Sequence, residues 1–222
     1  MDLFHFDWKT VPFRMIAFVI AFTLHEWAHA FVAWKLGDNT AKSEGRLTLN
    51  PIPHIDPFGL ILILFGPFGW AKPVPINPLH FRGNKRLGIV YVSVAGPIIN
   101  LILAILFCIV YFIVRDSGVL AGMNEKAAFA ITATLVFSVT INTALFIFNL
   151  LPIPPLDGYK IMRFLSPRSW DGKFYNLEVY GPWVLLLLIF IPGVRDVIFG
   201  VPLGIILNWV EMISFNIANV FN

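Results

Sequence analysis

VPFRMIAFVIAFTLHEWAHAFVAW, residues 11–34, is the stretch that decides the fold. It is apolar and longer than the roughly 20 residues that a helix needs to cross the hydrocarbon core of a bilayer. Its second half nevertheless carries His25, Glu26 and His29. Ionisable groups inside a membrane helix are costly and usually functional. Because no small-residue cleavage site follows the apolar run, the stretch is a transmembrane helix with a polar site rather than a signal peptide.

The composition of the whole chain also indicates a membrane protein. Of its 222 residues, 58% are hydrophobic and 13% are charged, whereas a soluble domain is roughly 25% charged. So small a supply of polar surface excludes a soluble globular enzyme, a coiled coil and a disordered chain. The net charge of +3 is explained by loop lysines and arginines, so no nucleic-acid partner is expected. The single cysteine, Cys108, excludes an internal disulfide framework and a cysteine zinc site.

Further apolar segments predict an all-α polytopic membrane protein. Residues 87–114 and 127–151 are long enough to span, and two shorter apolar segments follow within 179–215. Residues 58–70 are too short and too interrupted by Gly and Pro to span comfortably, which favours a re-entrant segment. Alternation in residues 46–50 predicts a short β-hairpin in the same region, about 40–75. We therefore expect one domain over residues 1–222, with about 5–6 transmembrane segments.

Basic residues predict the orientation of the chain. Residues 35–86 hold seven of the sixteen lysines and arginines and residues 152–180 hold four more, whereas charges of both signs balance in the 115–126 loop. The positive-inside rule places the two basic segments in the cytoplasm and the N-terminus outside. Residues 58–70 then enter and leave on the cytoplasmic side. If they span instead, the two basic segments face opposite sides, at least in part.

The pattern His25-Glu26-Trp27-Ala28-His29 carries the chemistry. Residues four apart lie on one face of a helix about one turn apart, so the two imidazoles can bind one zinc ion. Glu26 then lies beside the metal, where it can take a proton from water. The alternative is a pair of buried histidines whose hydrogen bonds are satisfied by backbone carbonyls or by Glu26.

Asp157 is the strongest candidate for a third ligand, because a catalytic zinc site usually has three protein ligands and one open position. It follows the 127–151 span within PPLDG, residues 154–158, where prolines end the helix and glycine permits a tight turn. In the orientation above, the first span reaches the cytoplasm at its histidine-bearing end, and the third span returns there just before Asp157. Alternatively, Asp157 only caps the turn.

Together the two motifs resemble those of the site-2 protease family of intramembrane zinc metalloproteases. The second motif reads NLLPIPPLDG, residues 149–158, and the span that contains residues 95–100 resembles the family's middle core helix. Residues 45–51 and 54–57 are similar to short bacterial and archaeal members. The resemblance covers about residues 13–165. It implies that His25, His29 and Asp157 hold one zinc ion per chain. It also implies that the protein lies in a prokaryotic plasma membrane. It also implies that Glu26 is the general base and that Asn149 contacts the substrate carbonyl or its oxyanion.

Several polar residues keep open roles at this point. The Asn149 amide can donate to developing negative charge or form an interhelical hydrogen bond. For Asn100, packing beside Gly96 is favoured over a catalytic part. His54 and Asp56 fit a simple turn, a second metal site or a proton relay, of which the turn is the commonest.

The expected activity is hydrolysis of a peptide bond within or near the transmembrane segment of a membrane-protein substrate, as in regulated intramembrane proteolysis. The substrate helix must unwind first, and residues 40–50 and 58–70 could receive it as an added strand. Few residues follow the last apolar segment, so substrate choice is expected to lie in the membrane domain or in a separate regulatory or adaptor protein. The alternatives are a protease with a zincin-like soluble domain and a non-catalytic membrane metal-binding or transport protein that uses the same ligands. Glu26 argues against the last, because a structural metal needs no base.

Overall fold

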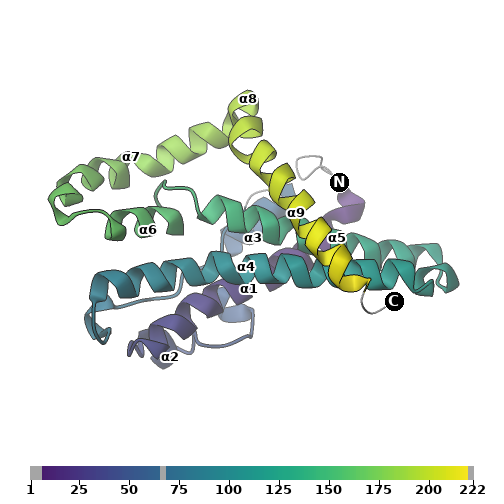
Figure 1. The fold of residues 1–222 in the computed structure, drawn as a ribbon, viewed down its shortest axis with the longest axis horizontal. Helices are drawn as coiled ribbons and strands as arrows, with labels where there is room; N and C mark the ends of the chain where they lie inside the picture. Colours follow the sequence, from purple (N-terminus) through teal and green to yellow (C-terminus); the bar gives the residue numbers. More distant parts are fainter. Residues whose placement is uncertain (1–6, 66–68, 220–222) are drawn as a thin grey trace.

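The computed structural model describes residues 7–65 and 69–219, which form helices joined by turns. The α-helices of these residues, labelled in Figure 1, are α1 (Val11–Lys35), α2 (Thr40–Ser43), α3 (Pro57–Phe65), α4 (Lys85–Asp116), α5 (Glu125–Asn149), α6 (Asp157–Leu165), α7 (Asp171–Phe190), α8 (Pro192–Arg195) and α9 (Val201–Ala218).

Within the described residues, four helical segments are long and apolar enough to cross a membrane: Trp8–Lys35, Lys85–Asp116, Glu125–Asn149 and Gly193–Ala218. The first three match the core spans predicted at 11–34, 87–114 and 127–151. The apolar part of α7, Phe174–Ile189, is shorter. The chain is therefore a helical multi-pass membrane protein, as its composition indicated.

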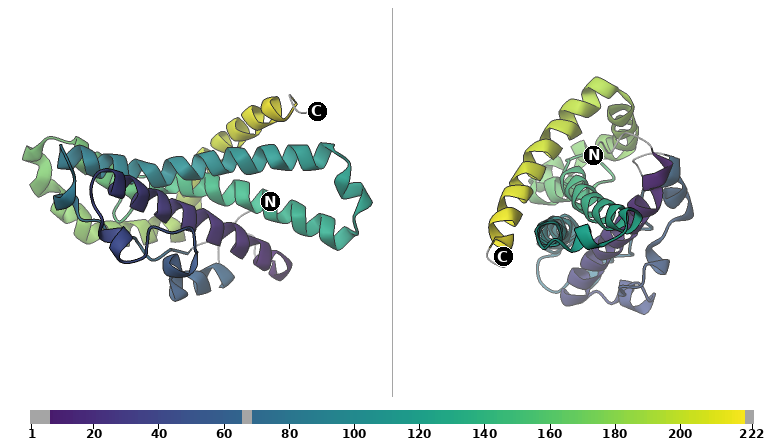
Figure 2. Two further views of the ribbon diagram at one scale, coloured as in Figure 1. Left: turned by 90° about the horizontal axis from the view of Figure 1, so that it is seen from below. Right: turned by 90° about the vertical axis from the view of Figure 1, so that its right-hand side faces the viewer.

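Helix α4 lies at the centre of the bundle. It packs against α1, α5, α6 and α9, and α9 crosses it obliquely (Figures 1 and 2). It begins where the Asn84 side chain accepts hydrogen bonds from the amides of Arg86 and Leu87. At about 1.5 Å per residue, its 32 residues exceed the thickness of the hydrocarbon core, so the helix extends beyond the membrane at one end or both.

Small residues let α1 approach its neighbours closely. Ala17, Ala21, Ala30 and Ala33 on α1 are fully buried, and Ala17 packs with Ala133 of α5. Small side chains at helix interfaces permit this close approach in membranes, where packing replaces the hydrophobic effect as the driving force. The second half of α1, with its ionisable residues, is thereby brought against the middle of α4.

The region between α1 and α4 differs from the prediction, because the strand expected at residues 46–50 is not formed. Residues 47–49 form bends, and within the described residues an isolated antiparallel β-bridge joins Ile55 to Ala71. A side chain takes the place of a partner strand: the Arg46 guanidinium donates to the carbonyl oxygen of Lys72 at 2.6 Å. An alternating pattern forms a strand only where a second strand lies alongside.

The segment predicted to be re-entrant, 58–70, begins within helix α3 and includes residues 66–68, which lie outside the described residues. Its two ends meet. Ile55 pairs with Ala71, and the Lys72 amide donates to the carbonyl oxygen of His54 at 2.9 Å.

A tight turn after α5 sets the position of Asp157. A Cβ atom on Gly158 would lie 2.2 Å from the carbonyl oxygen of Leu150, so this approach requires glycine. Helix α6 starts at Asp157. Its other end is tied to the start of α4, because the Arg86 guanidinium donates to the carbonyl oxygen of Ser166 at 2.8 Å. Both ends of α6 are thus fixed against the bundle.

Candidate metal centre

His25, Glu26 and His29 lie on the buried side of α1. Their exposed fractions are 4%, 8% and 6%. Ionisable groups this deeply buried need partners, because an isolated charge is expensive to remove from water. The partners come from three other parts of the chain.

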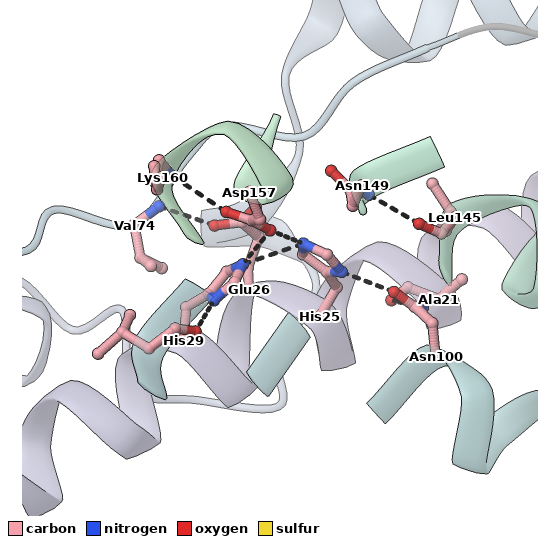
Figure 3. Close-up of polar contacts among 11 residues, drawn as sticks. Ala21, His25, Glu26, His29, Val74, Asn100, Leu145, Asn149, Asp157 and Lys160 are labelled. Carbon is pink, nitrogen blue, oxygen red and sulfur yellow. Dashed lines mark hydrogen bonds and ion pairs between the residues drawn. The ribbon is translucent and has the colours of Figure 1, made fainter. Parts of the chain in front are cut away.

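Asp157 meets the two histidines across the bundle (Figure 3). Its Oδ2 lies 3.2 Å from Nε2 of His25 and 3.0 Å from Nε2 of His29. The two Nε2 atoms are themselves 3.0 Å apart. All three side chains are buried and their ligand atoms form one group that could hold a metal ion. The helical spacing of the histidines and the turn after α5 therefore bring the predicted ligands to one point.

Hydrogen bonds on the far side of each imidazole decide which nitrogen faces this group. Nδ1 of His29 lies 2.7 Å from the carbonyl oxygen of Val92. A carbonyl can only accept, so Nδ1 of His29 carries the proton. Nδ1 of His25 lies 2.6 Å from Oδ1 of Asn100, which is likewise an acceptor. In a neutral imidazole with the proton on Nδ1, Nε2 keeps its lone pair, and in both histidines this atom faces the carboxylate oxygen of Asp157.

This donor set fits a zinc ion. With both imidazoles neutral, the two lone pairs and the carboxylate oxygen repel one another at such short range unless a proton or a metal ion lies among them. A tetrahedral site with bonds of about 2.0–2.1 Å separates its ligand atoms by about 3.3 Å, close to the 3.0–3.2 Å between these three atoms. Histidine ligands whose second nitrogen donates to an oxygen are usual in zinc sites.

Gly96 of α4 lies directly against the two rings. A Cβ atom there would be 2.5 Å from Cε1 of His25 and 2.5 Å from Nε2 of His29. The close approach of α4 to α1 therefore occurs at the candidate metal centre itself.

Glu26 is directed by the extended chain that precedes α4. Its Oε2 accepts a hydrogen bond of 2.8 Å from the Val74 amide. Val74 lies between Pro73 and Pro75, which have no N–H group to donate. The bond holds the carboxylate beside the three ligand atoms, as Figure 3 shows. The sequence pattern gave no indication that Val74 has this role.

Lys160, one turn along α6, binds the other oxygen of Asp157. Its Nζ lies 3.0 Å from Oδ1, while Oδ2 faces the histidines. The two carboxylate oxygens thus have separate partners, and one of them is kept for the ligand group.

Asn149, at the end of α5, is turned toward its own helix. Its Nδ2 donates to the carbonyl oxygen of Leu145 at 3.0 Å. The bond is within one helix, so it is not the interhelical bond considered from the sequence. Contact with a substrate oxyanion remains a prediction.

Asn100 has a larger role than packing beside Gly96. It is fully buried and holds Nδ1 of His25. The contacts of His54 and Asp56 fit a turn: Nε2 of His54 bonds the carbonyl oxygen of Thr48, and Asp56 accepts from the amide of Gly59 at the start of α3. Neither joins a group of possible ligands among the described residues.

Comparison with known proteins identifies a family and several relatives. Residues 113–189, which include Asn149 and Asp157, match the sequence model of Peptidase family M50. The chain is 47% identical over 195 residues to a Bacillus subtilis protein named "Putative zinc metalloprotease YwhC", an alignment that covers 86% of this chain and 87% of that one. It is 32% identical over 183 residues to Rip2 of Mycolicibacterium smegmatis, which is described in the same words, with 80% of this chain and 66% of Rip2 covered. For MJ0611 of Methanocaldococcus jannaschii, also described so, the identity is 33% over 166 residues, covering 71% of this chain and 76% of that protein. No solved structure matches the chain.

Proposed function

Because this chain belongs to peptidase family M50, the site-2 protease family, we propose that it is a zinc-dependent intramembrane protease. It hydrolyses a peptide bond within or near the transmembrane segment of a membrane-protein substrate, as in regulated intramembrane proteolysis. The observation that carries the proposal is the convergence of His25, His29 and Asp157 on one point within helices of membrane-spanning length. The zinc metalloprotease names of the relatives support the reaction class.

The zinc ligands in this proposal are Nε2 of His25, Nε2 of His29 and Oδ2 of Asp157. The metal, when bound, polarises the scissile carbonyl and lowers the pKa of a water molecule to about 7. Three protein ligands leave one position of a four-coordinate site open to water or substrate.

Glu26 is the general base of the proposed reaction. It takes a proton from the attacking water and later passes it to the leaving amine. The Val74 amide supports this role, because its hydrogen bond to Oε2 holds the carboxylate in place beside the ligand atoms. The other oxygen of the carboxylate is left to receive the proton.

Asn149 is assigned to the substrate carbonyl or its oxyanion. It lies eight residues before Asp157 in the sequence and at the end of α5. An amide donor at that position stabilises negative charge that develops on the carbonyl oxygen. The assignment requires the side chain to leave the carbonyl oxygen of Leu145 when substrate binds.

Substrate is aligned by the extended residues 71–77 rather than by residues 40–50. A helical substrate hides its carbonyls in internal hydrogen bonds, so it has to unwind, and its freed N–H groups can then donate to carbonyl oxygens of this segment. Residues 71–77 adjoin the base through Val74. The pairing of Ile55 with Ala71 supports a segment between them that enters and leaves on one side of the membrane.

We place the active site toward the cytoplasmic side of the membrane, in one domain over residues 1–222. The two basic segments support this, because they touch: Arg86 of the first segment forms an ion pair with Asp171 of the second at 3.3 Å. Because the two basic segments are in contact near the ends of α4 and α6, they are best explained as lying on the same side of the membrane. Substrate choice then comes from the membrane domain or from a separate regulatory or adaptor protein.

The test is Glu26→Gln in the full chain, purified and reconstituted in vesicles with candidate single-span membrane proteins. Cleavage is expected to disappear while one zinc ion per chain is retained, because the ligands are untouched. Glu44→Gln is the control, since Glu44 is exposed in the loop after α2 and should leave both quantities at the wild-type value.

Two outcomes would contradict the proposal. Full cleavage by Glu26→Gln rules out Glu26 as the base. The second outcome is that the wild-type protein holds one zinc ion per chain, but the membrane peptides are the same in cells that carry wild-type protein and in cells that carry Glu26→Gln. That result would favour a metal-binding or transport protein.

A further inference from the structure

Two buried asparagines connect the candidate metal centre to helix α5. Asn100 of α4 and Asn142 of α5 are both fully buried. Nδ2 of Asn100 donates to Oδ1 of Asn142 at 2.8 Å, and Nδ2 of Asn142 donates to the carbonyl oxygen of Ser138 at 2.8 Å. With the bond between His25 and Asn100, these contacts form a chain that crosses three helices and that we call the amide relay (His25, Asn100, Asn142 and the Ser138 carbonyl).

The direction of every bond in the amide relay follows from its last member. A backbone carbonyl can only accept, so Asn142 has to turn its NH₂ group to Ser138 and its oxygen to Asn100. Asn100 must then turn its NH₂ group to Asn142. This leaves the oxygen of Asn100 to face His25, and only a protonated Nδ1 can bond to it.

The tautomer of His25 decides whether it can bind metal. With the proton on Nδ1, the lone pair of Nε2 faces Asp157 and His29. With the proton on Nε2, the same nitrogen is a donor and cannot act as a ligand. His29 obtains the required tautomer directly from the carbonyl oxygen of Val92, whereas His25 obtains it through two side-chain amides.

We propose that Asn142 is a positioning residue of the zinc site, which acts through Asn100 to hold His25 in the tautomer that binds metal. The carbonyl oxygen of Ala21 also accepts from Nδ2 of Asn100, at 3.3 Å, but the bond to Asn142 is shorter. With both in place, each N–H of the Asn100 amide has a partner. Among the described residues the Asn142 side chain hydrogen-bonds Asn100 and the carbonyl oxygen of Ser138, so its effect on His25 passes through Asn100. The inference rests on the zinc site of the proposed function but not on proteolysis.

Asn142→Leu tests the relay, because leucine has nearly the same shape and cannot accept from Asn100. Removal of a residue behind a metal ligand weakens metal binding about 10–100-fold. For a residue one bond further out we expect the lower end, a roughly tenfold increase in the zinc Kd in a competition titration. In the metal-free protein, the ¹⁵N resonances of His25 should show a smaller fraction protonated on Nδ1.

Asn142→Asp separates positioning from folding. Aspartate keeps an oxygen toward Asn100 in either protonation state, although the buried acid lowers stability. This variant should therefore unfold at a lower temperature than the wild type and still keep the Nδ1-protonated tautomer and most of the zinc affinity.

Thr143→Val is the matched control. Thr143 is equally buried on α5, and its hydroxyl bonds only the carbonyl oxygen of Val139 in the contacts described, away from the relay. It should leave the zinc Kd and the His25 spectrum unchanged. The proposal is overturned if folded Asn142→Leu keeps the wild-type tautomer and zinc Kd. If Asn142→Leu does not fold, loss of the tautomer in Asn142→Asp overturns it. If the zinc Kd and the His25 tautomer change as expected but the wild-type protein cleaves no substrate, the result counts against the proposed protease activity and not against the amide relay.

Discussion

Gly96→Ala is the substitution that most directly tests the geometry of the metal centre. The change adds one methyl group on α4. Its carbon would lie 2.5 Å from Cε1 of His25 and 2.5 Å from Nε2 of His29. Ordinary contacts of a Cβ atom begin at 3.4 Å, so one helix or both rings must retreat by roughly 1 Å, a displacement large enough to matter for catalysis.

The expected magnitude follows from that displacement. A misplacement of about 1 Å costs about 100-fold in rate, and an added methyl group in a packed interior costs about 1–3 kcal/mol of stability. We expect cleavage to fall about 100-fold and the zinc Kd to rise at least about tenfold. Both are measured on purified protein, together with the temperature of unfolding in the metal-free state.

Gly204→Ala is the control for the general effect of replacing glycine in a membrane helix. Gly204 lies in α9, and a Cβ atom there would meet nothing within 4 Å. Alanine is favoured over glycine in a helix by about 1 kcal/mol, so this variant should be at least as stable as the wild type and fully active. Wild-type zinc affinity and cleavage in Gly96→Ala would refute the placement of the two rings against α4.

Two further predictions concern the loop between α1 and α4. Val74→Pro deletes the N–H that binds Glu26. Because a hydrogen bond to a charged group contributes about 1.5–3 kcal/mol, cleavage should fall about 10–100-fold with little change in the zinc Kd. The control, Val74→Ala, keeps the N–H and should cleave normally. Asp38 lies outside the spans, and although burial opposes its charge, hydrogen bonds from Thr40, the Asn77 amide and His80 outweigh it and lower its pKa. A lowered pKa stabilises the fold above the ordinary pKa near 3.8 and this contribution is lost as the pH falls through the folded value. Asp38→Asn should therefore unfold at a lower temperature at pH 7, and the difference from wild type should shrink below about pH 4; a difference independent of pH would show that the charge is not responsible.

The parts of the site that the sequence predicts are those set by local geometry. The spacing of His25 and His29 is a property of one helix, and the turn at Asp157 follows from proline and glycine chemistry. The roles of Val74 and Asn142 depend on which segments pack together, so local geometry does not set them. One signal was present for Asn142: it follows Ser138 by four residues within an apolar span, which places two polar groups on one helix face.

The strand expected at residues 46–50 failed for a related reason. Alternation describes which side chains share a face and does not supply a partner for the backbone. In this chain the guanidinium of Arg46 binds the carbonyl oxygen of Lys72, so a side chain links the two segments where a ladder was expected. A charged side chain at the start of an alternating run can therefore form hydrogen bonds with backbone groups that a partner strand would otherwise bind.

The arrangement of hydrogen bonds explains how two histidines can be held in the orientation that suits a metal ion inside a membrane protein. Each imidazole needs an acceptor behind it, and in this bundle that acceptor is ultimately a main-chain carbonyl: Val92 for His29 and Ser138, through the amide relay, for His25. Carbonyls of a regular helix already accept one bond and have a second lone pair to offer. Because the ligands come from α1 and α6 while these acceptors belong to α4 and α5, the three ligand atoms converge only when four helices are packed. Metal binding and helix packing are therefore coupled, since neither histidine is oriented for zinc until its neighbour helix is in place.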